Sequence, residues 1–228
     1  MKPLALLLVL ALAGCTAAPG EPFASQADPP PLGGSGPGYT GMIDPDWAQR
    51  TAEATGIPKL AVLAYAGAAV RAAEVYPDCA IGWNTLAGIG LVESDHGSFD
   101  GSSIGPDFTV SPPIYGVVLD GGDTEHIPDS DGGAIDGISD YDRAVGPMQL
   151  IPQTWASWPS DGNGDGVGDP QNIADASIAA ANHMCRAVAG PMTTPEGWRE
   201  GIAAYNSGGD YLRKVATAAQ RYLDEAVG

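Results

Sequence analysis

Apolar residues recur at three- and four-residue spacing through most of the chain after residue 43, as they do on the buried faces of amphipathic helices. The spacing is clearest after Pro58, which begins a segment rich in leucine and alanine. The expected helices cover residues 46–55, a longer stretch from 58, and residues 83–93, 147–158, 172–188, 195–205 and 210–226. This pattern predicts a mainly α fold.

Residues 97–142 interrupt the helical pattern. They are rich in glycine, aspartate and proline and have no periodicity of their own. Only residues 115–119 are typical of a short strand. An irregular insertion of this length in a compact domain usually has a function.

The first residues have the features of a bacterial export signal. Lys2 gives a positive start, and the apolar run Leu4–Leu12 is too short to span a bilayer as a helix. The run ends in Leu12-Ala13-Gly14-Cys15, which resembles a lipobox, where the signal is cut before a cysteine that is then acylated. We therefore expect a signal peptide over residues 1–14 and a lipid on Cys15 that holds an exported protein at a membrane of the cell envelope. The alternative is an ordinary signal peptide with a chance cysteine.

Residues 15–42 contain Pro29-Pro30-Pro31 and several glycines but almost no large apolar side chains. Such a composition buries too little surface to offset chain entropy, so it predicts a flexible linker behind the lipid anchor. Residues 43–228 then form one domain, long enough for an ordinary hydrophobic core.

The remaining two cysteines, Cys79 and Cys185, are an even pair in a chain expected outside the cytoplasm. An oxidising compartment favours a disulfide between them, which would connect two distant helical segments. Two buried free thiols are the alternative.

The charge of the chain is strongly negative, with 28 Asp and Glu against 10 Lys and Arg. Nucleic acid requires a basic surface, so this balance excludes a nucleic-acid partner. Many of the acids lie in glycine-rich loops between residues 95 and 175. Part of this negative charge is therefore a candidate for binding a cation.

Glu93 is the main candidate for catalysis. It continues an apolar stripe, because Leu86 and Ile89 lie seven and four residues before it on the same helix face. Gly97 soon ends the helix, which places the carboxylate near the partly negative C-terminus. Apolar neighbours and this dipole both disfavour the anion and raise the pKa of a carboxyl group towards neutrality. The alternative is a glutamate paired with a cation, for which His96 is the nearby candidate.

Two further segments carry candidate binding residues. In Gly146-Pro147-Met148-Gln149, the glycine allows a ligand close to the backbone, and the glutamine can bind a sugar amide or hydroxyl. Ala204-Tyr205-Asn206-Ser207-Gly208 places an aromatic ring and an amide side by side at the end of a helix. Taken alone, the first segment is also typical of a plain helix start and the second of a helix C-cap with a core tyrosine.

In this order, the three segments resemble the lytic transglycosylases, a superfamily of peptidoglycan-cleaving enzymes similar to goose lysozyme. The resemblance covers most of residues 44–225 and is closest to actinobacterial relatives of the membrane-bound lytic transglycosylase B group. It implies a lysozyme-like helical domain that cleaves glycan strands between N-acetylmuramic acid and N-acetylglucosamine. Glu93 would protonate the bond oxygen and then accept the proton of the muramyl C6 hydroxyl, so that a 1,6-anhydro sugar forms without water.

The resemblance also assigns the residues around the sugar. The motif positions that would bind substrate are Ser94, Gly146, Met148, Gln149, Tyr205 and Asn206, with Met148 acting through packing. The expected partners are peptidoglycan strands and, through Cys15, a membrane, and we expect a monomer.

Residues 161–172 match the start of an EF-hand calcium loop. Side-chain oxygens stand at loop positions 1, 3 and 5, a glycine at 6 and a backbone carbonyl at 7, but Asn172 replaces the usual glutamate at 12. The lytic transglycosylase B group resembles this arrangement, with a last ligand that comes later in the chain. The expected Ca²⁺ ligands are Asp161, Asn163, Asp165, the Val167 carbonyl and Asp175. The ion would be structural, and an empty Asp/Gly surface turn is the alternative.

Two other functions stay open. A lysozyme-type hydrolase of the inverting class needs a second carboxylate roughly 6.5–9.5 Å from Glu93, and Asp95, Asp107 and Asp120 are candidates. A non-catalytic peptidoglycan-binding lipoprotein would keep the groove without turnover, although the presence of Glu93 argues against it.

Overall fold

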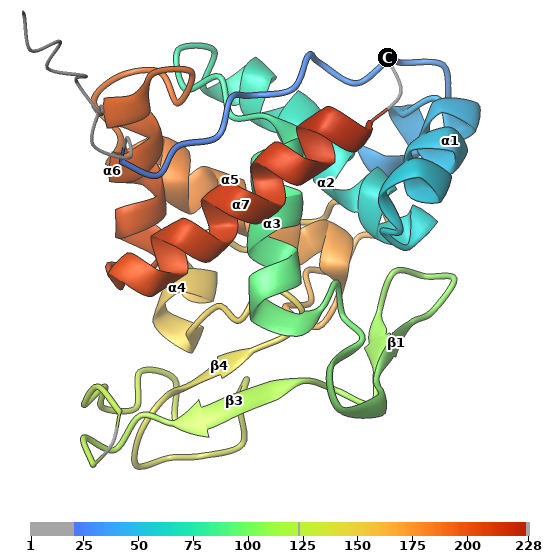
Figure 1. Ribbon diagram of the computed structural model, residues 1–228. Helices are drawn as coiled ribbons and strands as arrows, with labels where there is room; N and C mark the ends of the chain where they lie inside the picture. The colour runs from blue at the N-terminus through green and yellow to red at the C-terminus, as the bar shows by residue number, and fades with distance from the viewer. Residues whose placement is uncertain (1–20, 123, 227–228) are drawn as a thin grey trace, which may run out of the picture.

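The computed structural model describes residues 21–122 and 124–226, and in them the chain is mainly α-helical, as its hydrophobic pattern predicts (Figure 1). The α-helices are α1 (Pro45–Thr55), α2 (Lys59–Val75), α3 (Trp83–Ser94), α4 (Pro152–Ser157), α5 (Ile173–Ala187), α6 (Pro195–Tyr205) and α7 (Gly209–Glu225). Short 3-10 helices are η1 (Thr40–Met42) and η2 (Phe99–Gly101). The strands form two antiparallel pairs, β1 (Ser103–Ile104) with β2 (Val110–Ser111) and β3 (Tyr115–Val118) with β4 (Arg143–Val145).

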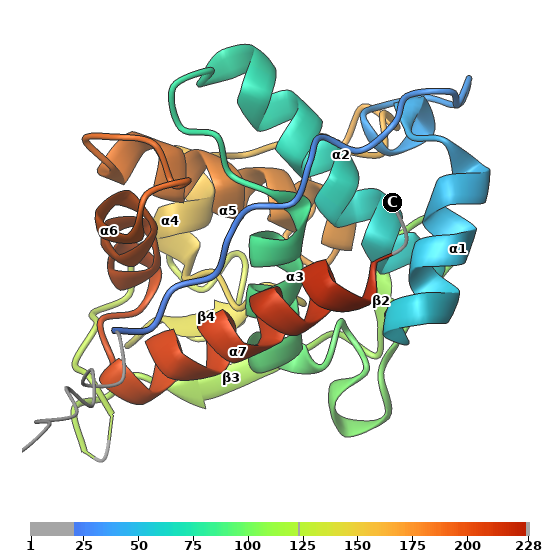
Figure 2. The same ribbon diagram turned by 45° about the horizontal axis from the view of Figure 1, so that its top comes forward.

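Helix α3 lies at the centre of the molecule, with α7 crossing it on one side and α2 packed on another (Figures 1 and 2). Its residues from Trp83 to Gly90 are all buried. Glycines allow this close packing: a Cβ on Gly88 would lie 3.0 Å from the Val215 carbonyl oxygen of α7, and a Cβ on Gly90 would overlap the hydroxyl of Tyr65 on α2. The helix that carries Glu93 is therefore fixed on two sides by neighbouring helices.

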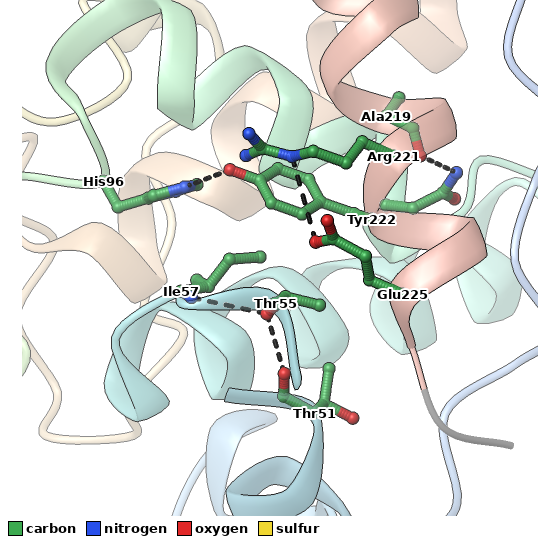
Figure 3. Close-up of polar contacts among 9 residues, drawn as sticks. Thr51, Thr55, Ile57, His96, Ala219, Arg221, Tyr222 and Glu225 are labelled. Carbon is green, nitrogen blue, oxygen red and sulfur yellow. Dashed lines mark hydrogen bonds and ion pairs between the residues drawn. The ribbon is translucent and has the colours of Figure 1, made fainter. Parts of the chain in front are cut away.

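A buried histidine follows the end of α3. His96 has a left-handed backbone conformation (φ 58°) and is 4 % exposed. Its two ring nitrogens form hydrogen bonds with the hydroxyls of Tyr65 (3.0 Å) and Tyr222 (2.7 Å; Figure 3). Because Tyr65 belongs to α2 and Tyr222 to α7, this chain of three side chains connects the C-terminal end of α3 to both neighbours.

The segment 21–42 corrects the prediction of a flexible linker over residues 15–42. It runs along the helices from α6 to α1 (Figures 1 and 2). Ala24 is fully buried, and the Gln26 side-chain oxygen accepts hydrogen bonds from the Gly82 backbone N–H (2.6 Å) and the Thr85 hydroxyl (2.9 Å) at the start of α3. These polar contacts, with Phe23 packed edge-on against Trp198 of α6, hold the segment on the helices although it has few large apolar side chains. The expected signal peptide and Cys15 lie outside the described residues.

The predicted disulfide is present. Cys79, in the loop between α2 and α3, is bonded to Cys185 of α5, with the two Cα atoms 5.3 Å apart. It joins parts of the chain that are 106 residues apart in sequence. None of the described helices is long and apolar enough to cross a membrane.

Residues 97–142 are mainly irregular, and the expected strand at 115–119 is observed as β3. The strand pairs with β4 beneath the C-terminal end of α3 (Figure 1). The helix predicted from Pro147 is wrong at its start, because α4 begins only at Pro152. Gly146 (φ 74°) and Gln149 (φ 47°) have left-handed conformations, and Val145 and Leu150 exchange backbone hydrogen bonds, so residues 145–150 form a tight turn.

Candidate active site

Glu93 lies in the last turn of α3 and is largely shielded from solvent. Burial raises the pKa of its carboxyl group from 4.5 to about 7, and a hydrogen bond from the Tyr211 hydroxyl opposes part of this rise. The Tyr211 oxygen donates to Glu93 Oε1 over 2.6 Å. Within the described residues Glu93 has no ion pair, and His96 bonds to two tyrosines instead. A carboxyl group with a pKa near neutrality can both donate and accept a proton at physiological pH.

Two tyrosines from consecutive helices stand beside this carboxyl group. The rings of Tyr205, at the end of α6, and Tyr211, in the first turn of α7, are stacked with centroids 6.5 Å apart and an interplanar angle of 11°. The Tyr205 hydroxyl donates to the backbone carbonyl of Met148. The structure thus brings Glu93, Tyr205 and the 146–149 turn together, as the three sequence segments predict.

Tyr211 is the residue of this site that the sequence reasoning missed. It stands at the start of an amphipathic helix, where one more aromatic residue is typical of a core position. The sequence signal for Tyr211 was its position just after the short Ser207-Gly208-Gly209 loop. Such a short connection brings the start of α7 back beside the end of α6.

Ser94 and Met148 are buried in the structure and are not open to a ligand. Ser94 is 2 % exposed; its hydroxyl donates to the Pro147 carbonyl (2.6 Å) and accepts from the Gly97 N–H (2.8 Å). Met148 is fully buried, in agreement with a role in packing. Both residues therefore hold the 146–149 turn against the end of α3 and have no free group for a ligand.

Gln149 and Gly146 place this turn next to strand β3. A Cβ on Gly116 of β3 would lie 2.8 Å from Gln149 Oε1, while Gln149 Nε2 donates to the Gly146 carbonyl (2.9 Å). A side chain at Gly146 would overlap the Pro170 carbonyl, so glycine is required there. Asn206 is exposed beyond the end of α6, and its Oδ1 accepts a hydrogen bond from the Gly208 N–H.

The three candidates for a second carboxylate have other surroundings. Asp107 accepts a hydrogen bond from the Thr109 N–H, and Asp120 accepts one from the Gly122 N–H, each within its own loop. Asp95 is exposed and has a left-handed conformation at the end of α3. None of these acids contributes to the shift in the pKa of Glu93, which burial raises and the Tyr211 hydrogen bond lowers.

The loop after α4 has the hydrogen bonds of a compact turn built on acidic side chains. Asp161 Oδ1 accepts from the backbone N–H of Gly164 (2.7 Å) and Asp165 (3.1 Å), and its Oδ2 accepts from Gly166 (2.9 Å). Asp165 Oδ1 accepts from the Val167 N–H (2.8 Å). These bonds orient the carboxylates around the centre of the loop.

Asp175, in the first turn of α5, closes this loop. It is fully buried, and its two oxygens accept from the N–H groups of Gly162 (2.7 Å) and Asp169 (3.0 Å). Burial, and to a lesser degree the charges of Asp161 and Asp165, raise the pKa of Asp175 to about 6 against the effect of these two bonds. A buried carboxylate close to two others is a set of hard oxygen donors that suits Ca²⁺. Within the described residues, however, the oxygens of Asp161, Asp165 and Asp175 are not grouped within 4.8 Å of one another, so this calcium site stays a prediction.

A second acidic cluster lies in the insertion. Asp129, Asp131 and Asp142 offer oxygens within 4.8 Å of one another. Asp129 and Asp131 accept main-chain N–H bonds from the same loop, and Asp142 accepts from Ser130. The cluster orders the 129–142 loop through these bonds.

Comparison with known proteins gives no match: no family model, characterised protein or solved structure is significantly similar to this chain.

Proposed function

We propose that this protein is a lytic transglycosylase that cleaves the β-1,4 bond between N-acetylmuramic acid and N-acetylglucosamine in peptidoglycan and leaves 1,6-anhydromuramyl ends. The observation that carries the proposal is the Glu93 carboxyl group, largely buried, with a pKa of about 7 and a hydrogen bond from Tyr211. The neighbouring Tyr205 and Gln149 belong to the motifs that resemble this family.

The reaction uses one carboxyl group twice. Protonated Glu93 donates its proton to the glycosidic oxygen, and the bond between that oxygen and the muramyl C1 breaks. The muramyl C6 hydroxyl then attacks C1, and the ionised Glu93 takes the hydroxyl proton. The acid is regenerated without water, and a pKa near 7 suits both steps.

The electrostatics around Glu93 support a mechanism with one carboxylate. A nearby second carboxylate would raise the pKa of Glu93 through its charge, whereas the rise here comes from burial. The acetamido group of the substrate can take over stabilisation of the cationic centre, as in substrate-assisted glycosidases. This favours the anhydro product over hydrolysis with a second protein carboxylate.

Mass spectrometry of digested peptidoglycan tests the proposal. The wild type should release anhydromuropeptides, and Glu93→Gln should release none. Glu53→Gln, an exposed glutamate of α1, is the matched control and should retain full activity. Products heavier by one water would identify a hydrolase, and peptidoglycan bound but left intact by the wild type would identify a binding protein.

Four associated features belong to the same proposal. The helical domain is lysozyme-like, and the 161–175 loop holds a structural Ca²⁺ through Asp161, Asn163, Asp165, the Val167 carbonyl and Asp175. The mature chain is exported and anchored in the cell envelope through a lipid on Cys15. It acts as a monomer on glycan strands.

A further inference from the structure

A groove of about 450 Å³ lies between α3 and α7. Apolar side chains of α3, Leu91 and Val92, form one wall, and α7 forms the other. The lining residues from α7 are Arg213, Lys214, Thr217, Ala218 and Arg221. The groove therefore combines an apolar wall with three cationic side chains.

This concentration of positive charge is unusual for the chain. Three of its 10 Lys and Arg residues line one groove, whereas the whole protein has 28 Asp and Glu. Arg213 pairs with Asp210, and Arg221 approaches Glu225 at 3.9 Å (Figure 3). Lys214 has no ion pair among the described residues, and it is exposed. A free ammonium group in an otherwise acidic surface attracts an anion.

The groove lies on the two helices that carry Glu93 and Tyr211, although neither residue lines it. Val92 is the residue of α3 before Glu93, and Tyr211, which bonds Glu93, lies three residues before Lys214 and ten before Arg221. This spacing puts the three α7 residues on one helix face. With a rise of about 1.5 Å per residue, Lys214 lies about 5 Å and Arg221 about 15 Å along α7 from Tyr211. An extended chain that leaves the reaction centre along α7 would pass both cations.

We propose that this groove binds the peptide stem of the muramyl residue next to the cleaved bond, with Lys214 and Arg221 contacting its carboxylates. The inference rests on the proposed function, because it takes peptidoglycan as the substrate. The stem branches from the same sugar that Glu93 acts on, and it alternates small apolar side chains with free carboxylates. Leu91, Val92 and Ala218 suit the methyl groups, and the cations suit the carboxylates.

Binding to the Glu93→Gln variant tests the groove separately from catalysis. Soluble glycan fragments with peptide stems are compared with the same fragments after an amidase has removed the stems. The Glu93→Gln variant should bind the stem-bearing fragment more tightly than the stem-free fragment. Adding Lys214→Ala should lower that preference about threefold to fivefold, and adding Arg221→Ala as well should lower it about tenfold. Lys214→Arg should restore most of it, and increasing salt should weaken it.

The matched control is Arg50→Ala, on the exposed surface of α1, added to Glu93→Gln. It should leave the preference for stem-bearing fragments unchanged. Equal binding of the two fragments, or an equal effect of Arg50→Ala and Lys214→Ala, would overturn the assignment. So would a preference that follows phosphate-bearing wall polymers rather than peptide stems. A wild type without anhydro product would contradict the proposed function alone, since the binding comparison decides the groove without turnover.

Discussion

The Tyr211 hydroxyl donates to Glu93 Oε1 over 2.6 Å and so joins the first turn of α7 to the last turn of α3. The hydrogen bond stabilises the carboxylate, whereas burial destabilises it, and the result is a pKa of about 7. Without the tyrosine, burial alone would raise the pKa further. Tyr211 therefore adjusts the acidity of the proposed catalytic group.

Substitution Tyr211→Phe should move the alkaline limb of the pH–activity profile to higher pH. The ring and its stacking on Tyr205 remain, but the anion of Glu93 loses a donor, so its pKa rises by roughly 0.5–1 unit. Activity of the wild type should fall above pH 7, as protonated Glu93 is lost. The measurement is the rate of anhydromuropeptide release from pH 5 to 9. An unchanged or more acidic limb would contradict this role of the hydroxyl.

Substitution Glu93→Gln should stabilise the fold at alkaline pH while it abolishes activity. The folded pKa of about 7 lies above the usual glutamate value of 4.5, so the stability that protonated Glu93 contributes is complete below pH 4.5 and is lost as the pH rises to 7. Glutamine does not titrate. At pH 8 the variant should be more stable by about 1–3 kcal/mol, and near pH 4 the two proteins should be similar.

Urea unfolding at both pH values measures this difference. Glu53→Gln, on the exposed face of α1, serves as the control and should show no comparable gain at pH 8. A Glu93→Gln variant no more stable than the wild type at pH 8 would show that the carboxylate is well solvated.

The sequence pattern predicts the helical core because each helix has its own apolar stripe. Trp83 to Gly90 are buried as the spacing indicates, and Glu93 continues that stripe into the site. Contacts between side chains that are far apart in the sequence could not be derived in this way. Tyr65 and Tyr222 lie 31 and 126 residues from His96 in the sequence, and no local pattern indicates that both tyrosines form hydrogen bonds with its ring.

Two segments were misjudged because local composition was the only guide. The 21–42 segment has few large apolar residues, yet Gln26 and Asn84 hold it through hydrogen bonds between distant parts of the chain. Pro147 is typical of a helix start, but the left-handed conformation of Gln149 and the contact of Ser94 with the Pro147 carbonyl produce a turn. Both errors concern backbone conformations that tertiary contacts decide.

Calcium should raise the midpoint of thermal unfolding, and a chelator should lower it. An ion that binds only the folded state stabilises it by about 2.7 kcal/mol at a hundredfold excess over its dissociation constant. Asp165→Asn should remove most of the calcium effect, because it removes one charge from the proposed ligand set. Asp129→Asn, in the second acidic cluster, is the matched control. Loss of the calcium effect in Asp129→Asn instead would assign the ion to that cluster.

The buried His96 should make the fold sensitive to acid. Burial, and to a lesser degree the charge of Arg221, lower its pKa from 6.5 to about 4. Other groups facing it are the hydroxyls of Tyr65 and Tyr222, and Asp95 is the adjacent acid in the chain. Because the folded pKa lies below the unfolded one, the stability contributed by the neutral ring is complete above pH 6.5 and is lost as the pH falls to 4, by about 3 kcal/mol.

This effect is best measured in Glu93→Gln, because Glu93 titrates over nearly the same range with the opposite sign. In that background, the free energy of unfolding should fall between pH 7 and 4, and the additional change His96→Gln should reduce the fall. Glutamine can donate and accept one hydrogen bond each, as neutral histidine does with the two tyrosines, but it gains no charge in acid. If the acid-induced loss persists in the double variant, groups other than His96 cause it, and the Tyr65–His96–Tyr222 chain does not control the acid stability of the site.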